Sequence, residues 1–479
     1  MKNSIIALSI LVSLFLQGCG LDAVENPNVT TEKFLDSPQS ATNWVNGSRS
    51  QMASTINVII ELTELTSDNY YNNRTISSKV FDIPQIDYTD LDVGRIQSAI
   101  HSLRRTADFG LNTVLPNDPD STPEQEAELK FYLAVSQLFS GEYFEALPNE
   151  SLGAPLPSET QLGLANTTFD EVISLAPNSD FAKAALIGKA RIAFHLNSTS
   201  DLRTLATSVV NNTPQFTYQV QFDGINGPSN SFQNLLFDSS QDEFAPLPRL
   251  DFLDPKYFSI DGAGISQIPV NLFKSEEAYL MLAELELKEN GLASAQPVLV
   301  DLLNDVIANR DVTSIDDSRE TRSGGNRTDY PLSDTVKVRF SQGEPALDDF
   351  ILDRQDGNVS IPTVSGTSVT VAQINNAATV DELLEIIYLM RQEIFIAEGR
   401  RVVDLGIKYP ISQQEQAGNT NISGSSPYLD AIIPGFIPLS RSMDDFTVDE
   451  TQGIVTIAVN MNEELVQNKS SDLVLPLWQ

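Results

Sequence analysis

The periodic placement of apolar residues is the feature that most constrains the fold of this chain. In residues 91–114, Ile96, Ile100, Leu103 and Ala107 recur at spacings of four, three and four. This spacing places their side chains on one face of an α-helix, because a helix completes a turn in about 3.6 residues. The pattern predicts an amphipathic helix that packs one side against other helices.

Helix-start and helix-stop signals agree with a mainly helical chain. Residues 31–55 carry apolar residues at helical spacing. Thr122, Pro123 and Gln125 supply an N-cap hydroxyl, a first-turn proline and a capping-box glutamine, so a helix is predicted to start there and end near Gly141. A mainly α fold follows.

Three later stretches carry the same periodicity and are predicted as two helix pairs and one long helix: 180–197 with 199–212, 275–290 with 293–309, and 380–399. With Glu276 as position 1, the second pair fits the tetratricopeptide pattern, in which small and large residues let two helices nest. The residues that match this pattern are Leu282, Ala283, Ala295 and Leu299. Other kinds of helix packing give similar rows and remain an alternative.

Long polar tracts rich in Pro, Gly and Asn separate the helices. Loops beyond about 15 residues are uncommon in compact domains and are usually functional. We therefore expect one domain over residues 32–479, a superhelix of tetratricopeptide-like helix pairs with a large loop-rich side and a few short strands. The expected loop insertions are 66–90, 213–270, 311–375 and 410–450.

The N-terminus carries a targeting signal. Lys2 precedes an apolar run over residues 5–16, which is too short for a membrane-spanning helix but suits a signal peptide. The only cysteine follows in Leu16-Gln17-Gly18-Cys19, which resembles the bacterial lipoprotein box. We expect a signal peptide over 1–18, acylation of Cys19 and a polar tether over 19–31, so that the protein is anchored to a membrane without spanning it. An ordinary signal peptide is the alternative.

Composition excludes several classes of function. With 65 acidic and 30 basic residues, the formal net charge is −35, which disfavours nucleic acid as a partner. One cysteine and two histidines cannot build a Cys/His zinc cluster, so no metal or cofactor is expected. His101 and His195 fall in predicted helices, and we interpret them as structural. No phosphate-binding loop and no G-x-S-x-G elbow is present.

One predicted loop has the residue types that sugars require. A sugar presents an apolar C–H face, on which an aromatic ring stacks, and hydroxyl edges, which amides and charged groups bind. The candidate ligand-binding residues are Asp68, Asn69, Tyr70, Tyr71, Asn73 and Arg74. A turn with a tyrosine packed into the core is the alternative. Arg95, Arg104 and Arg105 are basic residues that could offset the negative charge of the chain at one site.

The stretch 391–405 resembles the C-terminal signature of the SusD/RagB family, R-x-E-x-x-x-x-E-G-x-R-x-x-D-L. The matching residues are Arg391, Glu393, Glu398, Gly399, Arg401, Asp404 and Leu405. Opposed charges in this motif can tie the helix end to the segment that follows, so we interpret it as structural. The helix at 276–284 and the region around Cys19 also resemble the family.

The resemblance implies a fold and a role. SusD-like proteins are lipid-anchored at the outer face of the outer membrane in Bacteroidetes, and they have a tetratricopeptide-like helical fold. Each forms a lid over a SusC-like TonB-dependent transporter. They capture oligosaccharides or, in some systems, peptides, and they do no chemistry. For this chain the resemblance implies the same localisation, the same kind of partner and no enzymatic activity.

Two other classes of function remain open from sequence. A surface glycoside hydrolase needs only two carboxylates at a set separation, and 65 acidic residues offer many pairs. A tetratricopeptide-type adaptor would bind protein segments and have no small-ligand site.

Overall fold

The computed structural model describes residues 31–74, 79–237, 243–257, 267–316, 318, 327–353, 357–424 and 426–479. The expected signal peptide, Cys19 and all but the last residue of the expected tether lie outside the described residues. Within the described ranges, no helix combines the length and the apolar character needed to cross a membrane.

Helices dominate the described residues, as the sequence predicts. Those of the first half are α2 (Thr31–Leu35), α3 (Ser40–Thr66), α4 (Lys79–Asp82), α5 (Leu91–Phe109), η1 (Gly110–Val114), α6 (Leu115–Asn117), α7 (Pro123–Tyr143), α8 (Ser158–Leu175), α9 (Asp180–His195), α10 (Thr199–Asn212) and α11 (Ser231–Phe237). Those of the second half are η2 (Pro248–Leu250), η3 (Asp254–Tyr257), α12 (Glu276–Asn290), α13 (Leu292–Asp301), η5 (Leu302–Val306), η6 (Ile307–Asn309), α14 (Val371–Asn376), α15 (Val380–Ile394), α16 (Arg401–Asp404), α17 (Gln413–Gly418), η7 (Pro427–Leu429), α18 (Met461–Gln467) and η8 (Pro476–Trp478).

The predicted start and stop signals act as expected in the described helices. Thr122 and Gln125 form the reciprocal capping box of α7. Gly291 ends α12 with a φ of 79°, a backbone conformation that glycine adopts without steric cost. The predicted helix over 380–399 is shorter than expected: α15 ends at Ile394, because Ala397 and Gly399 take positive φ and the chain turns there.

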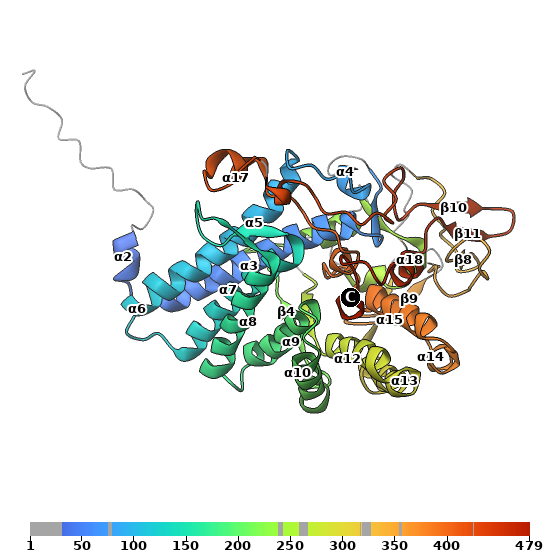
Figure 1. The fold of residues 1–479 in the computed structure, drawn as a ribbon, viewed down its shortest axis with the longest axis horizontal. Helices are drawn as coiled ribbons and strands as arrows, with labels where there is room; N and C mark the ends of the chain where they lie inside the picture. The colour runs from blue at the N-terminus through green and yellow to red at the C-terminus, as the bar shows by residue number, and fades with distance from the viewer. Residues whose placement is uncertain are drawn as a thin grey trace, which may run out of the picture.

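The helices stack in pairs along an arc. In Figure 1, α7, α8, α9 and α10 follow one another, and α12, α13 and α15 continue the series toward the right. Close approach requires a residue without a side chain at one crossing, where a Cβ on Gly188 of α9 would lie 2.7 Å from the ring of Phe169 in α8. The mainly α, tetratricopeptide-like fold is therefore confirmed.

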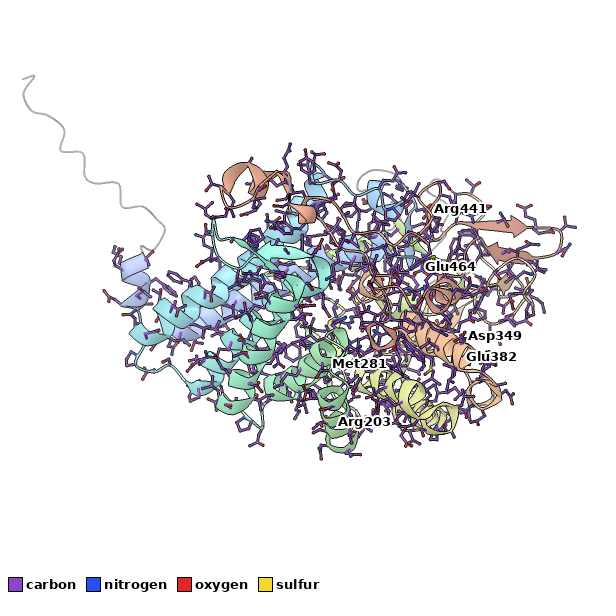
Figure 2. All side chains as sticks on the ribbon, viewed as in Figure 1. Arg203, Met281, Asp349, Glu382, Arg441 and Glu464 are labelled. Carbon is purple, nitrogen blue, oxygen red and sulfur yellow. The ribbon has the colours of Figure 1, made fainter. Side chains whose placement is uncertain are left out.

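The core runs through the whole of this scaffold, with one cluster of buried apolar residues drawn from nearly every helix. In Figure 2, Met281 of α12 lies in the middle of the molecule, whereas Arg203 of α10 lies at its edge. Met281 is buried, and the Arg203 guanidinium pairs with Glu289 on the surface.

Short strands occur within the long tracts, as predicted. Their bounds are β1 (Tyr70–Asn72), β2 (Ala146–Pro148), β3 (Pro155–Pro157), β4 (Thr217–Val220), β5 (Phe244–Pro246), β6 (Val270–Lys274), β7 (Val312–Asp316), β8 (Lys337–Arg339), β9 (Asn358–Pro362), β10 (Phe446–Asp449) and β11 (Ile454–Ile457). The antiparallel pairs are β1–β5, β2–β3, β4–β6, β7–β9 and β10–β11, and β8 adds to β11 in parallel. In Figure 1 the strands β8, β10 and β11 lie beside α18, away from the arc of helix pairs.

Candidate functional site

The C-terminal motif forms buried ion pairs that hold distant elements together. Arg391 of α15 binds Asp404 of α16 through two hydrogen bonds of 2.6 and 3.1 Å, and both side chains are buried. This pair ties the helix end to the segment that follows it, as the sequence predicts. Glu393 instead accepts hydrogen bonds from the hydroxyls of Thr367 and Ser368.

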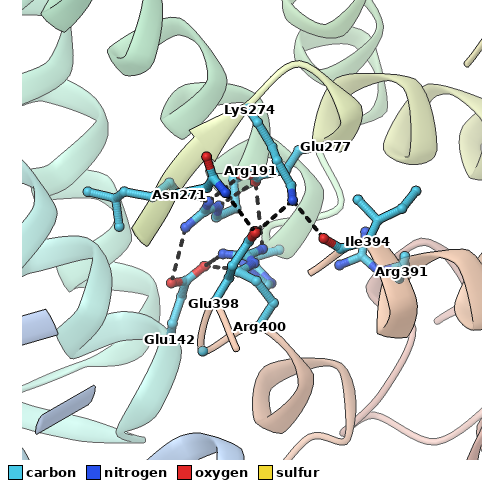
Figure 3. Close-up of polar contacts among 12 residues, drawn as sticks. Glu142, Arg191, Asn271, Lys274, Glu277, Arg391, Ile394, Glu398 and Arg400 are labelled. Carbon is cyan, nitrogen blue, oxygen red and sulfur yellow. Dashed lines mark hydrogen bonds and ion pairs between the residues drawn. The ribbon is translucent and has the colours of Figure 1, made fainter. Parts of the chain in front are cut away.

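Charges near the motif also connect the helix pairs (Figure 3). Lys274 of β6 donates to Glu398 at 2.7 Å and to the carbonyl of Ile394 at 2.6 Å. Arg400 pairs with Glu142 of α7 at 3.1 Å. The backbone N–H of Gly399 donates to Glu64 of α3 at 2.8 Å. These partners come from separate parts of the chain, so the contacts link β6, α7 and α3 to the segment that contains the motif.

The same network includes Asp68, one of the candidate ligand-binding residues that the sequence indicates. Arg401 binds Asp68 at 2.6 and 3.0 Å, and Gln392 donates to Asp68 at 2.8 Å. Burial would raise the pKa of Asp68, but the guanidiniums of Arg401 and Arg249 outweigh that effect and lower it. Asp68 is therefore a buried anion that is matched by arginines.

The neighbouring residues are also inside the protein. Asn69 and Asn73 are buried, Arg74 is half-buried, and the side chains of Tyr70 and Tyr71 are 0% and 6% exposed. The ring of Tyr70 packs edge-on against Phe232 at 5.3 Å, and that of Tyr71 lies 6.0 Å from Phe446. The expectation of an exposed loop is wrong, because β1 pairs with β5 and carries the rings into the core. In this conformation no sugar can stack on them.

An open cavity of about 500 Å³ lies elsewhere, on one side of α5, and we call it the α5 cavity. Its walls come from α5, η1, the loop between β2 and β3, and α17. The residues that line it are His101, Arg104, Arg105, Asp108, Phe109, Asn112, Thr113, Pro148, Asn149, Glu150, Ser151, Leu152 and Glu415.

A buried arginine fixes the floor of the α5 cavity. The Arg104 guanidinium donates to the carbonyl of Pro148 at 3.0 Å, to the hydroxyl of Ser140 at 2.6 Å and to the carbonyl of Ser136 at 3.1 Å. Burial lowers its pKa to about 10, which still leaves it charged at neutral pH. These bonds join α5 to α7 and to the end of β2, so the floor is rigid.

Two asparagines hold the loop that forms one wall. Asn419 donates to the carbonyl of Gly153 and Asn421 to that of Leu152, both at 2.7 Å. Leu152 has a φ of 57° and is 60% exposed, an unusual state for a bulky residue. Strained residues cluster at binding sites when the surrounding structure holds them in place. The loop therefore presents Leu152 to the cavity at a conformational cost.

Another part of the lining combines an aromatic ring with polar groups. Phe109 is half-buried, with its ring centroid 4.8 Å from that of Trp44. It is followed by η1, a π-helical turn that carries Asn112; such turns occur frequently at functional sites. Arg105 also lines the cavity, is exposed, and forms no ion pair within the described part of the chain.

Titratable groups in the α5 cavity have shifted pKa values. Burial, together with the charge of Arg104, lowers the pKa of His101 to about 4, so its imidazole is neutral at pH 7 and both donates and accepts hydrogen bonds. Burial raises the pKa of Asp108, and Arg104 partly opposes that shift. The cavity thus mixes apolar surface with amide, imidazole, carboxyl and guanidinium groups.

The sequence identified some lining residues and missed others. The sequence indicates that Arg104 and Arg105 are local basic residues and that His101 is a structural histidine. Phe109, Asn149 and Leu152 were missed, because their role depends on a π-helical turn and on a loop held by Asn419 and Asn421, which no local pattern encodes. Among the described residues, no group of three or more His, Cys, Asp or Glu side chains could hold a metal ion.

Stacked helix pairs beside a loop-rich side define a tetratricopeptide-like scaffold, and a comparison with known proteins narrows the fold further. No family model matches the sequence, and no curated protein matches it. A solved structure from Bacteroides vulgatus, of a protein provisionally assigned as sugar binding, covers 81% of this chain and 98% of its own, at 13% identity and a TM-score of 0.53.

Two further solved structures align with most of this chain. A SusD superfamily protein from Parabacteroides distasonis covers 83% of this chain and 99% of its own, at 12% identity and a TM-score of 0.52. One from Bacteroides fragilis covers 80% and 90%, at 12% identity and a TM-score of 0.51. At such low identity the alignments establish the fold. The chain has the SusD-like fold, which the motif at 391–405 predicts.

Proposed function

We propose that this protein is a non-catalytic lipoprotein of the SusD/RagB family that binds oligosaccharides in the α5 cavity and delivers them to a SusC-like TonB-dependent transporter of the outer membrane. The single observation that carries the proposal is the SusD-like fold, shared with a protein provisionally assigned as sugar binding. The motif at 391–405 and the lipoprotein box ending at Cys19 support the same assignment.

The α5 cavity has the surface chemistry for a sugar. Phe109 and Leu152 supply apolar contact for the C–H faces of a pyranose ring. Asn112, Asn149 and Arg105 supply donors and acceptors at its hydroxyl edges. A cavity of this size lies in the range of small-ligand sites, and Arg104 fixes its floor before a ligand arrives, which reduces the entropy lost on binding.

The first experiment is calorimetric titration of the soluble protein, lacking residues 1–19, with a panel of neutral and acidic oligosaccharides. We expect at least one to bind, and we expect Phe109→Ala to weaken that glycan about tenfold, or about 1.4 kcal/mol. Lys288→Ala, on the exposed end of α12, removes a side chain far from the cavity lining and is the matched control. If both variants lose the same affinity for the glycan, or if Phe109→Ala keeps full affinity, the glycan does not bind in the α5 cavity as proposed.

The hydrolase alternative is tested with the same panel. Asp108, whose pKa is raised by burial, lines the cavity together with Glu150, and an acid with a raised pKa beside a second carboxylate is what a glycosidase uses. We expect no new reducing ends after prolonged incubation. Turnover that Asp108→Asn abolishes would replace binding with hydrolysis as the function.

A further inference from the structure

A second cavity, of about 370 Å³, lies on a different part of the scaffold and shares no lining residue with the α5 cavity. It is bounded by the end of α7, the start of α8, the end of α9, the turn after α16 and the segment 472–479. In Figure 1 the C-terminus, marked C, lies beside α12 and α15 at the centre of the molecule. We call this the C-terminal cavity.

The deepest charges of the C-terminal cavity are already matched. Glu142 accepts from Arg400 at 3.1 Å and contacts the ring nitrogen of His195 at 3.0 Å. Asp404 is paired with Arg391 at 2.6 Å. Both carboxylates therefore have charged partners from within the chain, and the second oxygen of Glu142 lies 3.8 Å from the guanidinium of Arg191.

Lys408 is held by neutral groups. Its ammonium donates to the hydroxyl of Ser158 at 2.9 Å and to the carbonyls of Gly141 and Phe144 at 3.1 and 3.5 Å. These three acceptors match its three N–H bonds. Burial lowers the pKa of Lys408 to about 8, so the ammonium is still charged at neutral pH.

Three further carboxylates line the cavity and form no close ion pair in the described part of the chain: Glu145, Glu159 and Asp472. Glu145 and Glu159 interact with the Lys408 ammonium at longer range and partly oppose the effect of burial on its pKa. Glu145 is half-buried, and the other two are exposed. The single positive charge of Lys408 is smaller than the summed negative charge of these three carboxylates. This part of the lining is therefore negative overall, in a protein whose net charge is −35. Such a field attracts cations and repels anions.

Apolar side chains complete the rim. Leu196, just after α9, is 40% exposed, and Leu473 is 42% exposed. Both line the cavity together with the carboxylates. Exposed leucines beside unmatched carboxylates suit a ligand that has an apolar stem and a cationic end, as lysine and arginine side chains do.

We propose that the C-terminal cavity is a docking site for a lysine or arginine side chain that a partner protein presents between apolar residues. The stem of the basic side chain packs against Leu196 and Leu473, and its charged end reaches Glu145 and Glu159. This inference concerns a protein contact and goes beyond glycan capture in the α5 cavity. A single anchoring side chain in a pocket is how many protein interfaces gain most of their affinity.

The test uses two labelled pentapeptides, Gly-Leu-Lys-Leu-Gly and the same peptide with norleucine in place of lysine, both capped at their ends. We expect fluorescence anisotropy to show that the soluble protein binds the lysine peptide at least tenfold more tightly. We also expect this preference to shrink as the salt concentration rises from 50 to 500 mM, because salt screens exposed charges. Equal binding of the two peptides, or no binding of either at 1 mM, would overturn the proposal.

Variants separate the cavity from the general acidity of the protein. The double variant Glu145→Gln/Glu159→Gln is expected to bind the lysine peptide about tenfold more weakly. The control Glu32→Gln/Glu450→Gln makes the same change of charge at two exposed positions and is expected to bind normally. Glu159→Gln alone, at an exposed side chain, serves if the double variant fails to fold. Equal losses in cavity and control variants would show nonspecific attraction and reject the site.

Discussion

The Arg391–Asp404 pair has both of its charges buried, so each depends on the other to be tolerated in the protein interior. We expect Arg391→Ala to lower the free energy of unfolding by about 3–5 kcal/mol, because Asp404 is left as an uncompensated buried charge. Arg203→Ala removes an arginine from a surface ion pair and is expected to cost less than about 1 kcal/mol. Urea denaturation measures both, and similar losses would contradict the structural role of the motif.

Glu284 gives the stability of the protein a dependence on pH. Burial raises its pKa to about 7, while Arg391 opposes that shift. An exposed glutamate has a pKa of about 4.3, so between about pH 4 and 7 the folded protein keeps a proton that the unfolded chain has released. The contribution of Glu284 to the free energy of unfolding is therefore largest below about pH 4, and it is lost as the pH rises from about 4 to 7.

Replacing Glu284 by glutamine removes that titration. We expect Glu284→Gln to reduce the fall in unfolding free energy between pH 5 and 7.5 by roughly 1–3 kcal/mol. Glu32→Gln, at an exposed position, should leave the pH profile unchanged. If the unfolding free energy of Glu284→Gln depends on pH as steeply as that of the wild-type protein, the buried carboxyl does not hold a proton in this pH range.

The helices themselves were well predicted, since their signals are local. Apolar spacing in α5, the capping box of α7 and the glycine after α12 act within one or two turns. The placement of Asp68–Arg74 was not predictable in this way, because β1 pairs with β5 about 170 residues further along the chain and Arg401 lies further still. The α5 cavity was missed for the same reason, since separate segments form its walls.

The crossing of α8 and α9 depends on a glycine. A Cβ at position 188 would lie 2.7 Å from the Phe169 ring, so Gly188→Ala is expected to destabilise the protein by about 1–3 kcal/mol through overpacking. Gly163→Ala in the same helix pair meets nothing within 4 Å and should stabilise it by about 0.5–1 kcal/mol. Thermal unfolding measures both. If both substitutions stabilise the protein, the close crossing described for these helices is wrong.

At the scale of the whole molecule, we propose that a lipid on Cys19 anchors the helical scaffold to a membrane. We expect the full-length protein expressed in a bacterium to incorporate labelled palmitate, and Cys19→Ala to lose the label and leave the membrane fraction. Lys2→Gln, which changes only the start of the leader, should retain the label if export continues. Retention of the label by Cys19→Ala would contradict anchoring through this residue.

If the α5 cavity holds a sugar, a crystal structure of the protein with the glycan selected by titration will show the sugar there. We expect electron density for a pyranose ring in contact with Phe109 and Leu152, with hydroxyls near Asn112 or Asn149. Density for the glycan at another site, with the α5 cavity filled only by solvent, would contradict it.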